Sequence, residues 1–305
     1  MPYSFSQLGA AAEDLKQKAI DLKWKEMMAM PDSHPTDGGA QFLRDAQKQF
    51  ADVPSWFAPY TSTPDPAAYQ PMIDDLTYAL GNLCMQSIPD PIDRKMIAAD
   101  SRLGQWSLIQ QRLGEWTGPA ANQFEETFTA PFPQHTSNMF TLCALLKSSM
   151  EAYRDYWKSA RTDITSLING AIGAVEHGPV TMCSSNEWTM TWTVLIAVVG
   201  IASADLEGLA AYVGASIGGV FSVTQAAYTP PESQYGGNDA DSIMSSIHDA
   251  VRKHAQNLVS EEQKIVTALA SLQQAAADSS LYLAPTPEFV GATHKNIHSL
   301  LGDGK

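Results

Sequence analysis

Histidine and cysteine side chains are among the groups with which this chain could hold a metal or attack a substrate. The chain has seven histidines and three cysteines, yet it contains no HExxH motif and no cysteine pair at CxxC spacing. The cysteines, Cys84, Cys143 and Cys183, are far apart and odd in number, which argues against a metal cluster or a dense disulfide framework. We expect them to be unreactive thiols.

Other residues that could do chemistry have simpler structural explanations. His248 and His254 are six residues apart in a stretch expected to be helical, so their side chains face different directions. The sequence GASIGG (214–219) has no lysine after it and opens no βαβ unit, unlike a phosphate-binding loop. The glutamate pairs 125–126 and 261–262 suit solvated helix faces. We therefore predict no enzymatic activity, no cofactor, no metal and no small-molecule substrate.

The charge of the chain narrows the choice of partners. A formal net charge of -14, with only 19 lysines and arginines, leaves no basic surface for phosphates. We therefore expect no nucleic acid partner, and an anionic membrane surface would repel the chain as a whole. A hydrophobic content of 44% across 305 residues is enough for a sizeable folded core.

Apolar residues spaced by three and four predict helices along most of the chain. A first amphipathic helix begins near Phe5, and residues 31–66, rich in Pro, Gly, Ser and Asp, are expected to form a connector around one short helical piece. Three aromatic residues are expected to pack this connector: Trp56, Phe57 and Tyr60. A helix from about residue 66 has one apolar face, formed by Tyr69, Met72, Leu76 and Leu80. The next helix is expected at about 91–114.

Two longer runs, at about 134–176 and 240–278, repeat apolar residues with nearly heptad spacing. The second run is interrupted once, by Glu261, and contains Ile243, Ile247, Val251, His254, Leu258 and Ile265. Such long helices predict an all-α fold, an elongated helical bundle with antiparallel helices. Four segments are expected: N-terminal helices and connector (1–89), a hairpin with a long helix (90–178), an apolar Gly-rich hairpin (179–239), and a long helix with a tail (240–305).

The sequence WTGPAANQF (116–124) lies between two of these helices. Glycine can adopt the left-handed conformation that ends a helix, and proline suits the first turn of the next, so Gly118 and Pro119 predict a helix-turn-helix corner. We expect Trp116 to seal the open end of this hairpin and Phe124 to pack beside it. Prolines at 131 and 133 indicate a short helix after the corner, with the long helix starting only after them.

This stretch resembles the motif of the WXG family of type VII (ESX) secretion substrates, with Trp, then Gly two residues later and Phe eight residues after the Trp. The resemblance covers about residues 90–178. It implies that Trp116 and Gly118 form the turn between two antiparallel helices, that Phe124 lies in the adjacent core, and that the hairpin pairs with a helical partner. It also implies an actinobacterial protein, secreted or in the cell envelope, without a cleaved signal peptide. The N-terminus, MPYSFSQLGAAAEDLKQKA, lacks the regions of such a signal.

Members of this family have an export signal, a Tyr followed four residues later by Asp or Glu. Two pairs here have that spacing, Tyr228 with Glu232 and Tyr235 with Asp239. Both pairs lie in a stretch rich in Pro and Gly, where the spacing would not bring the two side chains to one helix face. A partner protein is the alternative source of the signal.

A segment with few charges separates the two long helices. Its uncharged runs, 189–204 and 208–231, are joined by SADLEG and predict a helical hairpin. The first run would be about 24 Å long as a helix, short of a hydrocarbon core of about 30 Å. Gly214 and Gly218 have the GxxxG spacing that lets helices approach closely. The residues expected to form this core or membrane hairpin are Val194, Ile196, Val199, Gly214, Gly218, Val220 and Phe221.

Two interpretations of this hairpin are open. It is either a buried core element or a membrane-inserting element of residues 188–227, whose position between long helices resembles the architecture of the cytolysin A-type α-helical pore-forming toxins. Asp205 and Glu207 make insertion costly unless they are neutralised or stay at the tip. The predicted function is that of a type VII secretion substrate acting through helix–helix association with a helical partner or in a homo-oligomer. Pore formation with membrane contact, and a structural or adaptor role, are the alternatives.

Overall fold

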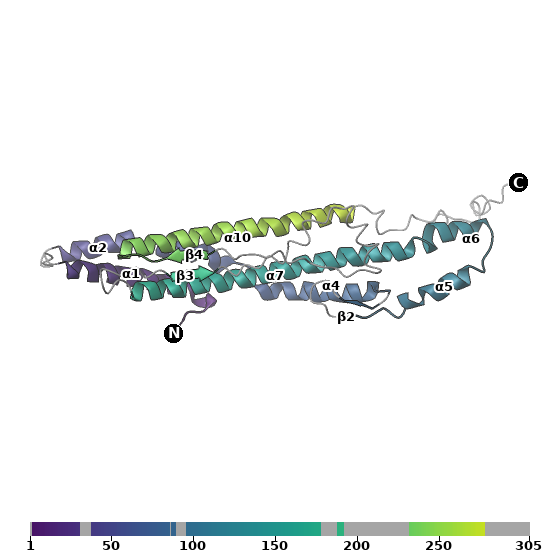
Figure 1. Cartoon of the computed structure of the whole chain (residues 1–305), viewed down its shortest axis with the longest axis horizontal. Helices are drawn as coiled ribbons and strands as arrows, with labels where there is room; N and C mark the ends of the chain where they lie inside the picture. The colour runs from purple at the N-terminus through teal and green to yellow at the C-terminus, as the bar shows by residue number, and fades with distance from the viewer. Residues whose placement is uncertain are drawn as a thin grey trace. The chain divides into compact units, whose positions relative to one another are not determined.

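The computed structural model describes residues 2–30, 38–85, 87–89, 96–177, 188–191 and 232–277. Helices account for most of these residues (Figure 1), which confirms the predicted all-α class. The chain forms two compact units, and each unit is built from segments that are far apart in the sequence. Unit 1 takes its described residues from Met1–Ala68, Tyr153–Ile196 and Ala227–Gln263, and unit 2 from Tyr69–Ala152 and Lys264–Lys305.

The N-terminal part of unit 1 is more helical than predicted. The turn η1 (Phe5–Gln7) leads into α1 (Leu8–Ala29), and the expected connector contains α2 (Gly39–Gln49), α3 (Val53–Phe57) and the turn η2 (Ala58–Ser62), with η3 (Pro66–Tyr69) after it. The prolines of this stretch explain the difference. Pro54 and Pro59 occupy the first turns of α3 and η2, where a missing backbone N–H costs nothing, so they start helical turns instead of breaking them.

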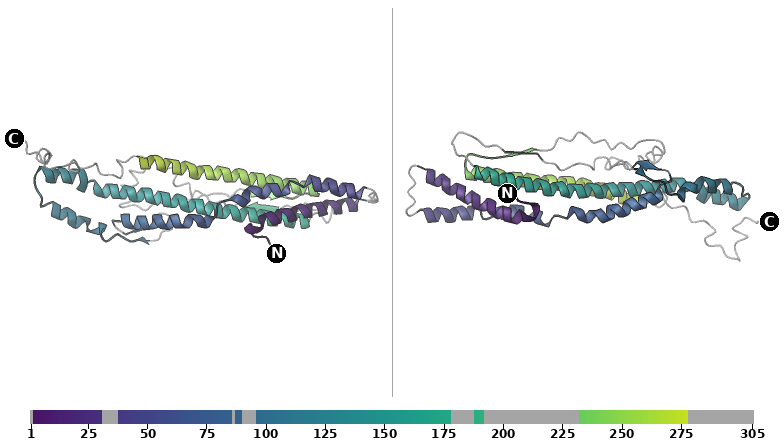
Figure 2. Two further views of the ribbon diagram at one scale, coloured as in Figure 1. Left: turned by 180° about the vertical axis from the view of Figure 1, so that it is seen from behind. Right: turned by 90° about the horizontal axis from the view of Figure 1, so that it is seen from below.

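The two long helices are α7 (Phe132–Glu176) and α10 (Ala240–Ala277), close to the predicted bounds. The prediction that the first of them starts only after Pro133 is wrong, because Pro133 lies in the first turn of α7, where its missing N–H is tolerated. Their unit 1 portions lie side by side in the views of Figures 1 and 2. The predicted apolar seam of α10 is confirmed, because six of its residues are buried: Ile243, Ile247, Val251, His254, Leu258 and Ile265. Glu261, the predicted interruption, is half-buried. From α1, Leu8, Ala12 and Leu15 complete the core of unit 1.

A two-stranded antiparallel ladder lies between the long helices in the sequence. β3 (Trp188–Thr191) pairs with β4 (Glu232–Tyr235), with Trp188 opposite Tyr235 and Thr191 opposite Glu232. The prediction of a helix from Thr189 is therefore wrong at its start. Threonines that alternate with Trp188 and Met190 favour a strand there, and the partner strand comes from more than 40 residues later in the chain.

The apolar hairpin itself lies outside the described residues, and so do its seven predicted core or membrane residues: Val194, Ile196, Val199, Gly214, Gly218, Val220 and Phe221. Among the helices that the structure does describe, none is both long enough and apolar enough to cross a membrane.

Unit 2 begins with α4 (Gln70–Leu83), followed by the strand pair β1 (Ile88–Pro89) and β2 (Met96–Ile97). In α4 the buried residues are Ile73 and Leu80, whereas Met72 is 50% exposed. The predicted apolar face is therefore correct at Leu80 and wrong at Met72. The buried stripe runs from Ile73 to Leu80, seven residues and about two turns apart.

The predicted helix at 91–114 is wrong over residues 96–102, and residues 91–95 lie outside the described residues. η4 (Leu103–Gln105) and α5 (Trp106–Leu113) begin only after β2. Asp100 explains the late start, because its carboxylate accepts hydrogen bonds from the backbone N–H groups of Arg102 (2.7 Å) and Leu103 (3.4 Å). These bonds form a local turn that begins the helical stretch at this point. The rest of unit 2 comprises α6 (Pro119–Phe124), the π-helical turn η5 (Glu125–Thr129) and the first part of α7.

Candidate functional site

The Trp-x-Gly corner lies in unit 2, between α5, which ends at Leu113, and α6, which begins at Pro119. Gly118 has φ 110° and ψ 173° and is the N-cap residue of α6. Its carbonyl oxygen accepts a hydrogen bond from the backbone N–H of Asn122 at 3.1 Å. Gly118 therefore starts the outgoing helix, whereas the sequence predicted that it would end the incoming one.

A continuous series of aromatic contacts connects the two arms of this corner. Trp116 contacts Phe124, with ring centroids 5.9 Å apart, and Phe124 contacts Phe128 at 5.2 Å. On the incoming arm, Trp106 stacks on Phe132 with centroids 4.0 Å apart. The spacing of eight residues in the motif therefore brings the Trp116 and Phe124 rings together across the turn.

The prediction that Trp116 seals the hairpin is wrong. Trp116 is 52% exposed, whereas Trp106 is only 8% exposed. Trp106 occupies the interior because it contacts both Phe128 and Phe132 from the opposite arm. Two residues of α5 share the exposure of Trp116: Leu108 is 47% exposed and Ile109 is 42% exposed. We call Leu108, Ile109 and Trp116 the corner surface.

The predicted export-signal residues have structural positions in unit 1. Tyr235 and Glu232 are the two ends of β4, and Tyr228 lies outside the described residues. Asp239 directly precedes α10, and its carboxylate accepts a hydrogen bond from the backbone N–H of Ser242 at 2.7 Å. The hydrogen bonds from Ser242 hold the pKa of Asp239 below its usual value. Asp239 is thus an N-cap of α10.

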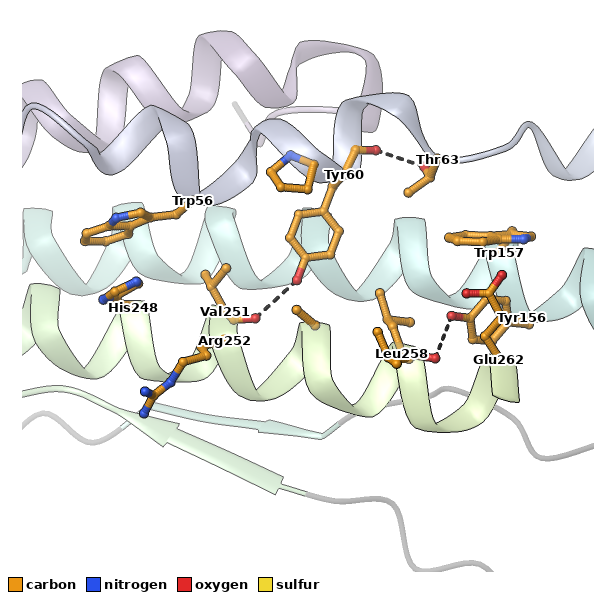
Figure 3. Close-up of a pocket in the computed structure, with 13 residues that line it drawn as sticks. Trp56, Tyr60, Thr63, Tyr156, Trp157, His248, Val251, Arg252, Leu258 and Glu262 are labelled. Atoms are coloured by element: carbon orange, nitrogen blue, oxygen red, sulfur yellow. Dashed lines mark hydrogen bonds between the residues drawn. The ribbon is translucent and has the colours of Figure 1, made fainter. Parts of the chain in front are cut away.

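A pocket of about 310 Å³ lies between three elements of unit 1 (Figure 3). Its lining comes from the α3–η2 segment (Trp56, Pro59, Tyr60, Thr63), from α7 (Tyr156, Trp157) and from α10 (His248, Val251, Arg252, Ala255, Leu258, Val259, Glu262). Sequence reasoning assigned Trp56 and Tyr60 to packing and did not predict a pocket. The clustering of aromatic residues in the connector was the available signal.

At one end of the pocket, Trp56 stacks on His248, with ring centroids 4.4 Å apart and planes inclined by 18°. The indole N–H of Trp56 donates a hydrogen bond to Asp52 Oδ2 at 3.0 Å, which fixes the orientation of the ring. Arg252 lies at the same end (Figure 3) and pairs with Asp249 at 3.0 Å.

The middle of the pocket is formed by Tyr60 from η2. Its hydroxyl donates a hydrogen bond to the carbonyl oxygen of Val251 at 3.1 Å. His254 Nδ1 lies 3.1 Å from the same hydroxyl oxygen. Because the only hydroxyl proton of Tyr60 goes to Val251, Nδ1 of His254 is the donor in the second bond. Burial lowers the pKa of His254 to about 4 and raises that of Tyr60, so both are neutral at pH 7.

At the other end, four residues form what we call the aromatic–carboxylate cluster: Tyr153, Tyr156, Trp157 and Glu262. The Tyr153 hydroxyl donates a hydrogen bond to Glu262 Oε1 at 2.5 Å, and the Tyr156 hydroxyl donates one to the carbonyl oxygen of Leu258 at 2.9 Å. The Trp157 ring lies edge-on to both tyrosines, with centroids 4.7 Å from Tyr156 and 6.0 Å from Tyr153. The cluster therefore combines three aromatic rings with a carboxylate that the Tyr153 hydroxyl orients.

The lining of this pocket has the composition of a ligand site. Aromatic and aliphatic walls with a few oriented polar groups are typical of ligand sites. Within the described parts of the chain, no group of three or more His, Cys, Asp or Glu side chains could hold a metal ion.

One further pattern lies outside the described residues: 214–218 reads Gly-Ala-Ser-Ile-Gly, the GxSxG spacing that hydrolases place between a strand and a helix.

Comparison with protein-family models, with curated proteins and with solved structures gave no match to this chain.

Proposed function

We propose that the protein is a non-enzymatic type VII secretion substrate that acts by associating with a helical partner or with a second copy of itself. The observation that supports this proposal best is the corner of unit 2. There a Trp-x-Gly turn joins two helical arms, Trp116 meets Phe124 across the turn, and Trp116 is 52% exposed.

The corner surface supplies apolar area that the described part of the chain leaves uncovered. Leu108, Ile109 and Trp116 are each more than 40% exposed, and covering apolar surface contributes about 25 cal/mol per Å². Single exposed apolar residues are ordinary, but three on one arm and the turn that follows it favour an interaction surface. A helical hairpin with an apolar stripe is the partner that fits such a surface.

Export from the native host tests the secretion part of the proposal. Trp116→Ala should lower the amount of protein outside the cell at least fivefold while leaving the amount inside unchanged, because it removes the motif residue without touching the core. Tyr78→Ala is the matched control, since Tyr78 is an exposed aromatic residue of the same unit, 77% exposed, on α4. Equal export of the Trp116→Ala variant and the wild type would contradict the proposal.

Pore formation is the second candidate, and the β3–β4 ladder supports it. The ladder ties together the two ends of residues 192–231, and the only charged residues of that stretch are Asp205 and Glu207. An apolar segment whose two ends are held together by a ladder is the part of the chain that would insert into a membrane.

Dye release from neutral phosphatidylcholine vesicles tests this candidate. The wild type should release dye more strongly at acidic pH, because protonation of Asp205 and Glu207 lowers the cost of insertion. Gly218→Asp should abolish release while the protein stays folded by circular dichroism. An absence of release at both neutral and acidic pH would exclude this candidate.

A further inference from the structure

We propose that the pocket of unit 1 binds an organic cation, an ammonium or guanidinium group on an apolar stem. The cation would lie at the aromatic–carboxylate cluster and the stem along the apolar wall of α10. This site goes beyond the proposed function, because it lies in unit 1 and involves neither the corner surface nor an export step.

Charge is the first argument for a cation. Glu262 is half-buried, and the hydrogen bond from Tyr153 orients its carboxylate at the end of the pocket. Among the residues that the structure describes, no Lys or Arg nitrogen lies within 4.0 Å of this carboxylate. Arg252, the cation that also lines the pocket, lies at the opposite end and pairs with Asp249 (Figure 3). Among the described residues, Glu262 therefore has no ion-pair partner within 4.0 Å, and a ligand cation could take that position.

The aromatic rings are the second argument. Trp157 and Tyr156 line the pocket beside Glu262, and Tyr153 lies edge-on to Trp157. The negative face of an aromatic ring attracts a cation within about 6 Å of its centroid, and Trp attracts it most strongly. Aromatic rings that line a pocket beside a carboxylate favour a cation over a neutral or anionic group of the same size.

The wall of the pocket explains why the cation should have an apolar stem. Along the pocket wall, α10 contributes Val251, Leu258 and Val259, and Val259 is 68% exposed. Alkyl chains that end in a charge pack their methylenes on such a surface and keep the charge at its edge. The volume of about 310 Å³ is at the small end of the usual range for ligand pockets, about 300 to 1,000 Å³.

Isothermal titration calorimetry of the full chain with three six-carbon probes tests the site. n-Hexylammonium should bind saturably, 1-hexanol should bind at least about fivefold more weakly, and hexanoate should not bind. The three probes share a stem and differ in charge. Glu262→Gln should weaken n-hexylammonium binding about fivefold. Glu261→Gln is the matched control: it makes the same charge change on the same helix outside the pocket lining, and it should leave the affinity within about twofold.

The source of the cation is distinguished by a second pair of probes. These are an amphipathic helical peptide with one arginine and the same peptide with glutamine at that position. Tighter binding of the arginine peptide than of n-hexylammonium would identify a partner's side chain as the ligand, and the reverse order would identify a small molecule. Equal binding of n-hexylammonium and 1-hexanol, or unchanged binding by a Glu262→Gln protein with native circular dichroism, would overturn the proposal. Neither result depends on whether the protein is exported.

Discussion

At Gly118 the backbone conformation restricts the type of residue more than the surrounding space does. A Cβ atom added there would meet no heavy atom within 4 Å, yet φ is 110° with ψ 173°, a region that is almost confined to glycine. Gly118→Ala should therefore lower the free energy of unfolding by about 1–3 kcal/mol, measured by urea denaturation. The loss would come from strain at the corner.

Gly81→Ala is the control for this substitution. Gly81 lies inside α4 of the same unit, and a Cβ atom there would also meet nothing within 4 Å. Because its backbone is helical, alanine should raise the free energy of unfolding by about 0.5–1 kcal/mol. Changes of opposite sign in the free energy of unfolding of the two variants would show that backbone conformation decides the effect. A Gly118→Ala protein as stable as the wild type would contradict this account.

His254 makes the stability of unit 1 depend on pH. Burial lowers its pKa from 6.5 to about 4 in the folded protein, so between these values the unfolded chain binds a proton that the folded one does not. The contribution of the neutral His254 side chain to the free energy of unfolding is complete above pH 6.5 and is lost as the pH falls towards 4. The expected loss is about 3 kcal/mol at most. Urea denaturation at several pH values between 4 and 7 measures it.

His254→Gln should flatten this dependence, because glutamine keeps an N–H donor for the Tyr60 hydroxyl and does not titrate. His248→Gln serves for comparison, since His248 is an exposed histidine six residues earlier on α10. We expect it to leave the slope between pH 4 and 6.5 close to that of the wild type. If the His254→Gln variant kept the full dependence of the free energy of unfolding on pH, another titrating group would be responsible for that dependence.

At the scale of the element, Asp239 combines a helix cap with a position in a predicted export signal. Asp239→Ala should cost about 1 kcal/mol, because α10 loses the hydrogen bond between its N-cap carboxylate and the Ser242 N–H. Asp239→Ser should cost much less, since serine is also a good N-cap. Thermal unfolding of the two variants measures the difference.

The same pair of variants separates the cap from the signal. Asp239→Ser removes the acidic group of the Tyr235–Asp239 pair and preserves the cap. Lower export of the serine variant from the native host, at unchanged stability, would identify the pair as a signal. Normal export of the serine variant would leave capping as the role of Asp239.

At the scale of the whole molecule, the corner surface should govern association. Replacing both Leu108 and Ile109 with serine should change the free energy of unfolding by no more than about 1 kcal/mol, because both side chains are already exposed. Self-association, or binding to a partner isolated from the host, should weaken at least tenfold in sedimentation velocity. Met28→Ser is the control, since Met28 is 48% exposed on α1 of unit 1. Equal loss of association in the control would refute a specific role of the corner.

The sequence by itself determined the long helices and the corner. Heptad spacing and local turn residues are properties of consecutive residues, so the predicted runs at 134–176 and 240–278 lie within two residues of Phe132–Glu176 and Ala240–Ala277. The Gly-Pro step likewise predicted a helix-turn-helix corner at 118–119, because each residue type restricts its own backbone.

Only the tertiary structure decided which tryptophan of the corner is buried, where β3 finds its partner, and that a pocket exists. Each of these depends on contacts between residues far apart in the chain. Tyr60 reaches Val251 across 191 positions, and Tyr156 reaches Leu258 across 102. Periodicity identifies the face of a helix that will be buried, but it does not contain the identity of the side chain that covers it. The pocket could not be predicted without knowing which side chains pack together, because its walls come from three separate segments of the chain.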